Sequence, residues 1–236
     1  DGILEVLQEG YGFIRCENFL PGENDVYVAP SQIRRFNLKT GDIIRGPKKA
    51  KTQAEKFADI NDAAWAKEAI GALAYEGVVA GYEDGTIRPN AEITRDEFVK
   101  LLVCALSVEL KAGAVTSYSD ITSGSWQEPY IAAATEAGIV SGTGALTFGS
   151  GETITRQDMA TMIYRAVLKL KVTLPNDKLT AFKDAEMIAG YATEAVNKLA
   201  AAGVISGMGD DTFAPGACAT RAQAISMIFA IRSLMK

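Results

Sequence analysis

The sequence contains no histidine, three cysteines and no long apolar run. Without histidine, the usual zinc sites, the Ser-His-Asp and Cys-His nucleophile systems and the commonest general base are excluded. Cys16, Cys104 and Cys218 are far apart and form no CxxC pair, so we expect small buried thiols rather than a disulfide framework. No apolar run approaches the ~18 residues that span a bilayer, which predicts a globular chain without membrane insertion. These absences lead us to expect no enzyme, no metal site and no cofactor.

The chain also opens without a charged-then-apolar signal segment. We therefore expect either a start inside a mature chain or a protein that was never exported. The first 51 residues carry 8 Lys and Arg against 7 Asp and Glu, whereas the rest carries 16 against 22. The longer part, with a net charge of −6, is a poor partner for nucleic acid. If any part binds RNA, it is the first fifty residues.

Three landmarks recur in the same order after residue 56, about every 61 to 65 residues. The first is an aromatic-x-Asp opening that ends at Asp59, Asp120 and Asp184. The second is a stop bounded by two glycines, at residues 77–81, 138–142 and 203–207. The third is a Thr-Arg pair at residues 94–95, 155–156 and 220–221. Such a fixed period predicts a repeat architecture.

Each repeat is typical of a helix, a turn and a second helix. The first helix, for example over residues 63–75, is rich in Ala and Glu and stops at a glycine, as C-caps in the left-handed conformation do. The second begins with a capping box. The boxes pair Thr94 with Glu97, Thr155 with Asp158 and Thr220 with Gln223, and the short Asp158 weakens the middle one. One helix pair cannot bury its own apolar face, so we expect a mainly α fold, a compact bundle of three repeats with pseudo-threefold symmetry.

The capping boxes place Arg95, Arg156 and Arg221 at the first position of the three second helices. Unpaired backbone N–H groups and the positive end of the helix dipole lie there, and acidic residues are preferred. Three arginines at this unfavourable position indicate an anion, because a guanidinium with free amides can cradle a carboxylate or a phosphate. The alternative is a salt bridge to an acid of a neighbouring repeat, and both can hold.

An aromatic residue stands twelve positions before the first stop glycine of each repeat, as Trp65, Trp126 and Tyr191. A flat aromatic near an anion site suits stacking on a sugar ring. The alternative is a helix anchored in the core by its first aromatic side chain.

These residues resemble the S-layer homology family. Its Thr-Arg-Ala-Glu signature corresponds to the three Thr-Arg segments, and its Trp-Ala-x-x-Ala-Ile helix and Gly-Tyr-x-Asp-Gly turn correspond to residues 65–70 and 81–85. The resemblance covers about three quarters of the chain and implies repeats at 57–116, 117–180 and 181–236. It further implies a location at the bacterial cell surface and inter-repeat grooves for secondary cell-wall polysaccharide, with the signature arginine meeting the carboxylate of a pyruvylated amino sugar.

The site residues that this resemblance implies for carbohydrate binding are Arg95, Arg156, Arg221, Trp65, Trp126, Tyr191, Asp59, Asp120, Gly81 and Gly142. Departures from the family pattern concentrate late in the chain, where Tyr191 replaces tryptophan. The third groove is therefore the least expected to bind.

The first fifty residues follow a different pattern. Short alternating stretches, broken by glycines and by Pro21-Gly22, suit a small β-barrel of the oligonucleotide-binding type. Tyr11, Phe13 and Tyr27, with Arg15 nearby, fit a base-stacking platform with a phosphate contact. The alternative places these aromatics on the core face of a sheet.

Residues 10–15 and 25–36 resemble the RNA-binding domain of the transcription termination factor Rho, and the likeness runs from residue 1 to about 46. It implies binding of single-stranded RNA through Tyr11, Phe13, Arg15 and Tyr27, and a cytoplasmic location. The last barrel strand is missing, which leaves an incomplete barrel, and residues 47–56 are typical of a linker. A cytoplasmic domain beside exported motifs indicates a chimera. RNA binding is the alternative to a cell-wall anchoring function.

Overall fold

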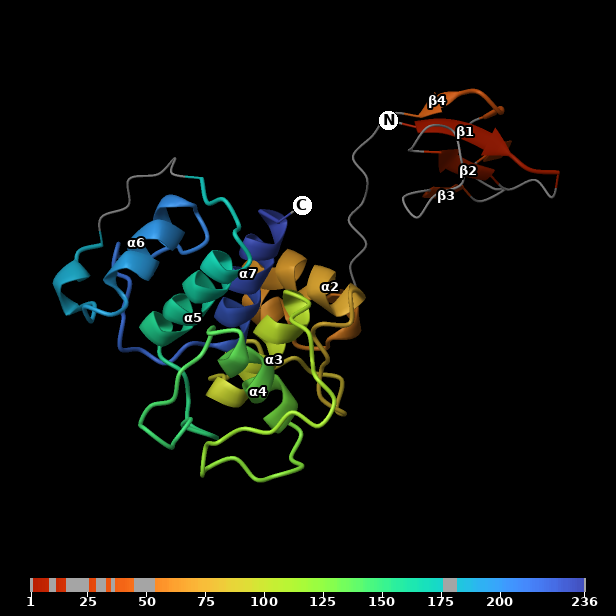
Figure 1. Ribbon diagram of the computed structural model, residues 1–236. Coiled ribbons are helices and arrows are strands. Elements are labelled where there is room, and N and C mark those ends of the chain that lie inside the picture. The colour runs from red at the N-terminus through yellow and green to blue at the C-terminus, as the bar shows by residue number, and fades with distance from the viewer. Residues whose placement is uncertain are drawn as a thin grey trace. The chain divides into compact units, whose positions relative to one another are not determined.

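The computed structural model describes residues 2–8, 12–15, 26–28, 33–34, 37–44, 54–175 and 182–235. The chain divides into two compact units, Asp1–Ala50 and Lys51–Lys236 (Figure 1). Tyr11, Cys16 and the first part of the predicted linker, residues 47–53, lie outside the described residues.

The described strands of the first unit form an antiparallel sheet in the order β3-β2-β1-β4. The strands are β1 (Gly2–Val6), β2 (Gly12–Arg15), β3 (Val26–Val28) and β4 (Ile43–Ile44). Leu4 lies opposite Ile14 in the register and is buried with Val28 and Ile33. Because side chains alternate between the two faces of a strand, this apolar set marks the core face of the sheet.

The second unit is helical, as the sequence predicts. Its first helix of each repeat is α2 (Lys67–Tyr75), α4 (Glu128–Glu136) and α6 (Thr193–Ala201). The second is α3 (Arg95–Ala105), α5 (Arg156–Lys169) and α7 (Arg221–Ser233). Short 3₁₀ helices are η1 (Ala54–Lys56), η2 (Ile60–Ala66) and η3 (Ala185–Met187). A mainly α fold is thereby confirmed.

The predicted glycine stops are confirmed at Gly77, Gly138 and Gly203, which have φ values of 75°, 72° and 72°. In the first repeat the amides of Gly77 and Val78 donate to the carbonyls of Ala74 and Leu73. This is the Schellman pattern, which requires the left-handed conformation that glycine adopts without strain.

The start of the first predicted helix, at residue 63, is wrong. Ala63 has φ −140° and ψ 60°, so the backbone breaks between two helical segments and the α-helix begins at Lys67. Trp65 therefore lies on a 3₁₀ turn, one turn before the helix on which the sequence places it.

The three predicted N-caps are present at the second helices. Thr94 and Thr220 form complete capping boxes with Glu97 and Gln223. Thr155 accepts from the Asp158 amide, but the short Asp158 side chain bonds the Thr155 hydroxyl at 2.7 Å instead of returning to the backbone.

The segments just before these caps bond to one another in a closed ring. The Ile93 amide donates to Ala219, Ala219 donates to Ile154, and Ile154 donates back to Ile93, at 2.9–3.1 Å. All three side chains are fully buried. The second helix of each repeat packs on the first helix of the next: α3 on α4, α5 on α6, and α7 on α2 (Figure 1). The third repeat thus packs against the first.

Candidate functional site

The three predicted arginines are all buried, each at the first position of its helix. Each Nε donates to a backbone carbonyl of the next repeat, which orients the guanidinium. The acceptors for Arg95, Arg156 and Arg221 are Phe148, Phe213 and Ile87, at 3.0, 2.7 and 3.0 Å. Each arginine therefore joins two repeats.

The backbone amides expected to be free at these helix starts are occupied, so this part of the predicted anion cradle is wrong. The amides of Arg95, Arg156 and Arg221 donate to Glu152, Ala217 and Ala91, each at 2.9 Å. The threonine caps take a further amide in each helix. Because the neighbouring repeat supplies these carbonyls, the first amide of each second helix is not available to a ligand. The outer Nη2 atoms of Arg95 and Arg156 also donate to the carbonyls of Ser141 and Ser206, both at 3.4 Å.

The third residue of the following repeat's second helix differs in charge between the repeats, and where it is acidic it lies within ion-pair distance of the guanidinium. Arg221 Nη1 lies 3.1 Å from Glu97 Oε1, and Arg95 Nη1 lies 4.0 Å from Asp158 Oδ2. The corresponding residue for Arg156 is the neutral Gln223. Among the described residues, no acidic side chain lies within ion-pair distance of Arg156. The predicted salt bridges thus exist for two arginines.

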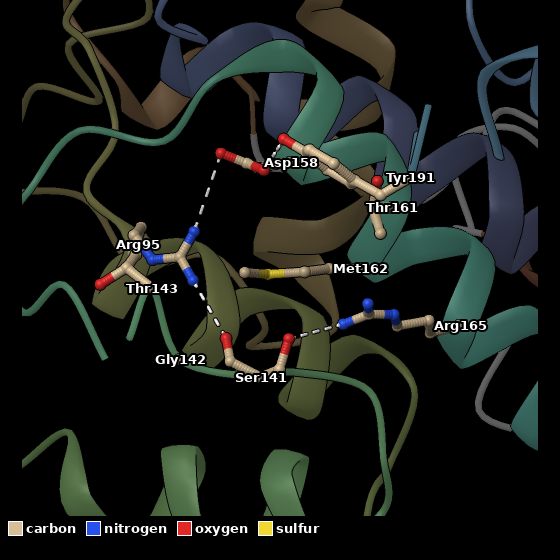
Figure 2. A pocket seen from close by; sticks show the side chains of 9 residues that line it. All are labelled: Arg95, Ser141, Gly142, Thr143, Asp158, Thr161, Met162, Arg165 and Tyr191. Carbon is tan, nitrogen blue, oxygen red and sulfur yellow. Dashed lines mark hydrogen bonds and ion pairs between the residues drawn. The ribbon is translucent and has the colours of Figure 1, made fainter. Parts of the chain in front are cut away.

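The Arg95 groove holds about 390 Å³ and combines residues of all three repeats (Figure 2). It is lined by Arg95, Ser141, Gly142, Thr143, Asp158, Thr161, Met162, Arg165 and Tyr191. Figure 2 shows Arg95 and Tyr191 both reaching Asp158, while Arg165 donates to the Ser141 hydroxyl at 3.0 Å. Two cations and one carboxylate leave this groove with an excess of positive charge.

The Arg156 groove is larger, about 660 Å³, and lies between the third and first repeats. Its polar and aromatic lining includes Trp65, Glu68, Arg156, Ser206, Gln223 and Ser226, beside the glycine-rich turn 203–209. Burial lowers the pKa of Arg156, against a smaller opposing effect of Asp184. Arg156 is 4% exposed and lines this groove, and its Nη2 donates to the Ser206 carbonyl at 3.4 Å.

At the third equivalent place, the Arg221 cluster, side chains of the protein surround the guanidinium. We define it as Arg221, Tyr82 and Glu97. The Arg221 Cζ lies 5.0 Å from the Tyr82 ring centroid, and Lys100 Nζ lies 5.3 Å from that of Trp126. Glu97 accepts a hydrogen bond from Arg221 Nη1, so the charge of this guanidinium is paired within the protein.

The three predicted aromatics are exposed, so the alternative that they anchor helices in the core is wrong. The exposed fractions are 63% for Trp65, 51% for Trp126 and 59% for Tyr191. Tyr191 donates its hydroxyl to Asp158 at 2.7 Å. Partial burial and this carboxylate raise the pKa of Tyr191 to about 12.

Asp59 and Asp120 bond to backbone amides of their own repeats. Asp59 accepts from the amides of Ile87 and Arg88, and Asp120 accepts from those of Phe148, Gly149 and Ser150. Ile87 and Phe148 are also residues whose carbonyls hold the signature arginines. The two aspartates therefore position the loop that orients a guanidinium.

Gly81 and Gly142 lie where the turn passes close to the repeat's opening aromatic. A Cβ on Gly142 would lie 2.2 Å from the Thr147 carbonyl oxygen, and one on Gly81 would lie 2.5 Å from Phe57 Cε1. Both positions therefore require glycine, and Gly142 also lines the Arg95 groove.

For the predicted RNA platform, the structure describes two side chains. Arg15 bonds Glu5 at 2.8 Å and lies 5.1 Å from the Phe13 ring centroid. Phe13 lies opposite Tyr27 in the strand register. The guanidinium expected to contact phosphate is thus already paired with a carboxylate on the neighbouring strand.

Sequence reasoning missed Asp158, Gln223 and Arg165 as groove residues. The first two were assigned only to capping boxes, since nothing in the local pattern shows that they also line the same groove as the arginine of the preceding repeat. Among the described residues, no group of three or more cysteine or acidic side chains could hold a metal ion. No helix in the described ranges is both long and apolar enough to cross a membrane.

The geometry defines a cyclic repeat unit with arginine-containing grooves at its repeat junctions. The family model described as the S-layer homology domain matches residues 56–99, 117–160 and 181–225. The chain belongs to the S-layer homology family. A second model, the RNA-binding domain of the Rho termination factor, matches residues 1–63.

The relatives named here each match one part of the chain. The chain is 34% identical over 178 residues to an amylopullulanase of Thermoanaerobacterium thermosulfurigenes, covering 74% of this chain and 9% of that protein. It is 34% identical over 176 residues to the exoglucanase XynX of Acetivibrio thermocellus, covering 74% of this chain and 16% of that protein. It is also 51% identical over 59 residues to the transcription termination factor Rho of Escherichia coli, covering 24% of this chain and 14% of that protein. The chain thus spans a small part of each of these proteins.

Proposed function

We propose that the helical unit is a non-catalytic anchoring module that holds its protein at the bacterial cell surface by binding secondary cell-wall polysaccharide. The observation that carries this proposal is the pairing of a buried guanidinium with an exposed aromatic side chain, contributed by different repeats, at the grooves. Membership of the S-layer homology family supports it.

The ligand that suits this pairing is a sugar with a carboxylate, such as a pyruvylated amino sugar. A carboxylate can take two N–H groups of a guanidinium, and a sugar ring can stack on an indole or phenol. Arg95, Arg156 and Arg221 supply the cations, and Trp65, Trp126 and Tyr191 the stacking surfaces. Gly81 and Gly142 keep the turns close to the core, whereas Asp59 and Asp120 act through the loops they position.

The proposed organisation is a pseudo-threefold bundle of repeats at 57–116, 117–180 and 181–236, preceded by an incomplete oligonucleotide-binding-type barrel at 1–46 and a linker at 47–56. The ring of hydrogen bonds through Ile93, Ile154 and Ala219 supports the threefold relation. The open strand order β3-β2-β1-β4 supports a partial barrel.

The test is binding to purified cell-wall sacculi with and without their pyruvyl groups. We expect Arg95→Ala and Arg156→Ala each to weaken binding by about 2 kcal/mol, since a charge-assisted pair is lost. Lysine at either position should restore binding only in part, because a point charge cannot reproduce the planar, two-pronged hydrogen bonding of a guanidinium. Lys198→Ala, at an exposed position of α6, serves as a control, and thermal melting establishes that each variant is folded. Binding by the Arg95→Ala/Arg156→Ala double variant that equals that of the unchanged protein would contradict the assignment of the grooves as binding sites.

The alternative function is binding of single-stranded RNA by the first unit, and the specific observation in its favour is the match to the Rho RNA-binding domain. We expect weak binding, because Arg15 is paired with Glu5 and the barrel is incomplete. Fluorescence anisotropy with a short pyrimidine-rich RNA at low salt tests this. Submicromolar binding that disappears in Phe13→Ala would establish RNA as the main partner.

A further inference from the structure

The Arg95 groove contains a second guanidinium at a position where the other two repeats have an uncharged residue. Arg165, on α5, lines this groove and stands nine positions after Arg156. Nine positions after the other two helix-start arginines stand Cys104 on α3 and Ala230 on α7. Ala230 lines the Arg156 groove in turn. The repeat pattern therefore does not require an arginine here, and the second guanidinium distinguishes one groove from its counterparts.

The two guanidinium groups of this groove bond the same serine from different sides (Figure 2). Arg95 Nη2 donates to the Ser141 carbonyl at 3.4 Å, and Arg165 Nη1 donates to the Ser141 hydroxyl at 3.0 Å. Because each guanidinium bonds a different oxygen of this residue, the two positive charges occupy separate places along the groove.

Arg165 differs from Arg95 in its surroundings. Arg95 is 5% exposed, and its Nη1 lies 4.0 Å from Asp158 Oδ2. Arg165 is only partly buried, and no acidic side chain of the described residues lies within ion-pair distance of it. Its bond to Ser141 goes to a neutral hydroxyl and uses one of the five N–H donors of a guanidinium. The charge of Arg165 is therefore not compensated by a carboxylate, unlike the charge of Arg95.

We propose that Arg165 is a second anion-binding residue, and that it gives the Arg95 groove a preference for glycan segments with two negative charges. The inference rests on the proposed function and deepens it. One acidic group of the ligand binds at Arg95, and a carboxylate on the neighbouring sugar binds the Arg165 guanidinium. The groove holds about 390 Å³, which is within the range of ligand-binding clefts. The Arg156 groove, with Ala230 at the equivalent position, has no such preference.

The chain supplies a matched variant, Arg165→Ala, because alanine stands at the equivalent position of the third repeat as Ala230. Arg165→Gln removes the charge but keeps a donor for the Ser141 hydroxyl, which separates charge from packing. Lys169→Ala is the control, since it removes a positive charge from an exposed position of the same helix, outside the groove lining.

The probes are two disaccharides of N-acetyl amino sugars, one with a pyruvyl ketal on each ring and the other with a single pyruvyl ketal. Titration of the ¹⁵N signals of the arginine Nε groups gives the affinity at each groove separately, and thermal melting shows that each variant is folded. Low ionic strength is used, because salt screens a partly exposed charge.

We expect the Arg95 groove of the wild-type protein to bind the doubly charged probe about tenfold more tightly than the singly charged one, since charge-assisted hydrogen bonds are strong. The Arg165 signal should shift with the doubly charged probe, and the Arg156 signal should respond equally to both probes. Arg165→Ala and Arg165→Gln should remove the preference but keep binding of the singly charged probe, and Lys169→Ala should retain both.

Two results would overturn the inference and leave the anchoring function intact. One is a wild-type protein that binds both probes with equal affinity at the Arg95 groove. The other is a preference that survives in the Arg165 variants. Failure of the wild-type protein to bind sacculi and either probe would overturn the anchoring function as well.

Discussion

At the scale of single residues, the exposed aromatic side chains can be tested for a role in binding separately from a role in stability. Trp65 lies on the 3₁₀ turn η2 with most of its side chain exposed, on the wall of the Arg156 groove. Its removal should therefore leave the core unchanged while taking away the surface on which a sugar ring can stack.

We expect Trp65→Ala to reduce glycan affinity roughly tenfold with little change in melting temperature, and Trp65→Phe to be milder. Calorimetric affinity and thermal melting measured on the same samples test this. A large fall in melting temperature with unchanged affinity per folded molecule would show that the indole serves the core.

A second prediction at this scale concerns the titration of Tyr191, whose pKa is raised to about 12 by partial burial and by Asp158. The folded protein favours the neutral phenol, so the stabilisation by this contact is complete below about pH 10 and is lost as the pH rises through about 12. ¹³C NMR of the tyrosine Cζ atoms can follow this titration. Asp158→Asn should shift the titration towards the ordinary tyrosine range. A wild-type Tyr191 that titrates in the ordinary tyrosine range would contradict its hydrogen bond to Asp158.

At the scale of elements, each repeat uses the backbone N–H and C=O of one residue to connect an aspartate with an arginine. The Phe148 amide donates to Asp120, and the Phe148 carbonyl accepts from Arg95 Nε. The same arrangement joins Asp59, Ile87 and Arg221. The aspartate at the opening of a repeat thus fixes the loop that orients the arginine of the preceding repeat.

We expect Asp120→Ala to lower the free energy of unfolding by about 1–2 kcal/mol, because three backbone amides lose their acceptor at a partly solvated site. The Arg95 Nε signal should broaden or shift as well. Asp120→Asn keeps one acceptor oxygen and should have a smaller effect on both. Chemical denaturation provides the free energies. An unchanged Arg95 Nε signal in the Asp120→Ala variant would show that Asp120 does not position Arg95.

At the scale of the whole helical unit, the repeats form a closed ring rather than an open row. The α7 helix packs on α2, and the Ala219 segment bonds both Ile93 and Ile154. In a linear repeat array each unit depends only on its neighbours. Here the loss of any repeat exposes the apolar faces of both others.

We therefore expect a chain that ends at residue 175 to lose cooperative unfolding instead of becoming only one third less stable. Differential scanning calorimetry of this shortened chain beside the full chain tests it. A sharp transition with a proportionate fraction of the enthalpy would mean that two repeats fold independently, as in an open solenoid.

The sequence by itself determined those features that depend on local chemistry. Glycines in the left-handed conformation end the first helices at Gly77, Gly138 and Gly203, and threonines cap the second helices, because both signals act within a few residues. The same local regularity made the repeats and the position of each arginine predictable.

The tertiary structure alone decided what those arginines face. The neighbouring repeat occupies the first amide of each second helix, and Asp158 and Glu97 each lie within ion-pair distance of a guanidinium more than fifty residues away in the chain. A capping residue and a charge partner have the same sequence pattern, since the cap acts through the backbone while the partner depends on which helix lies opposite. Packing of the repeats around the ring sets that choice, and with it the charge of each groove.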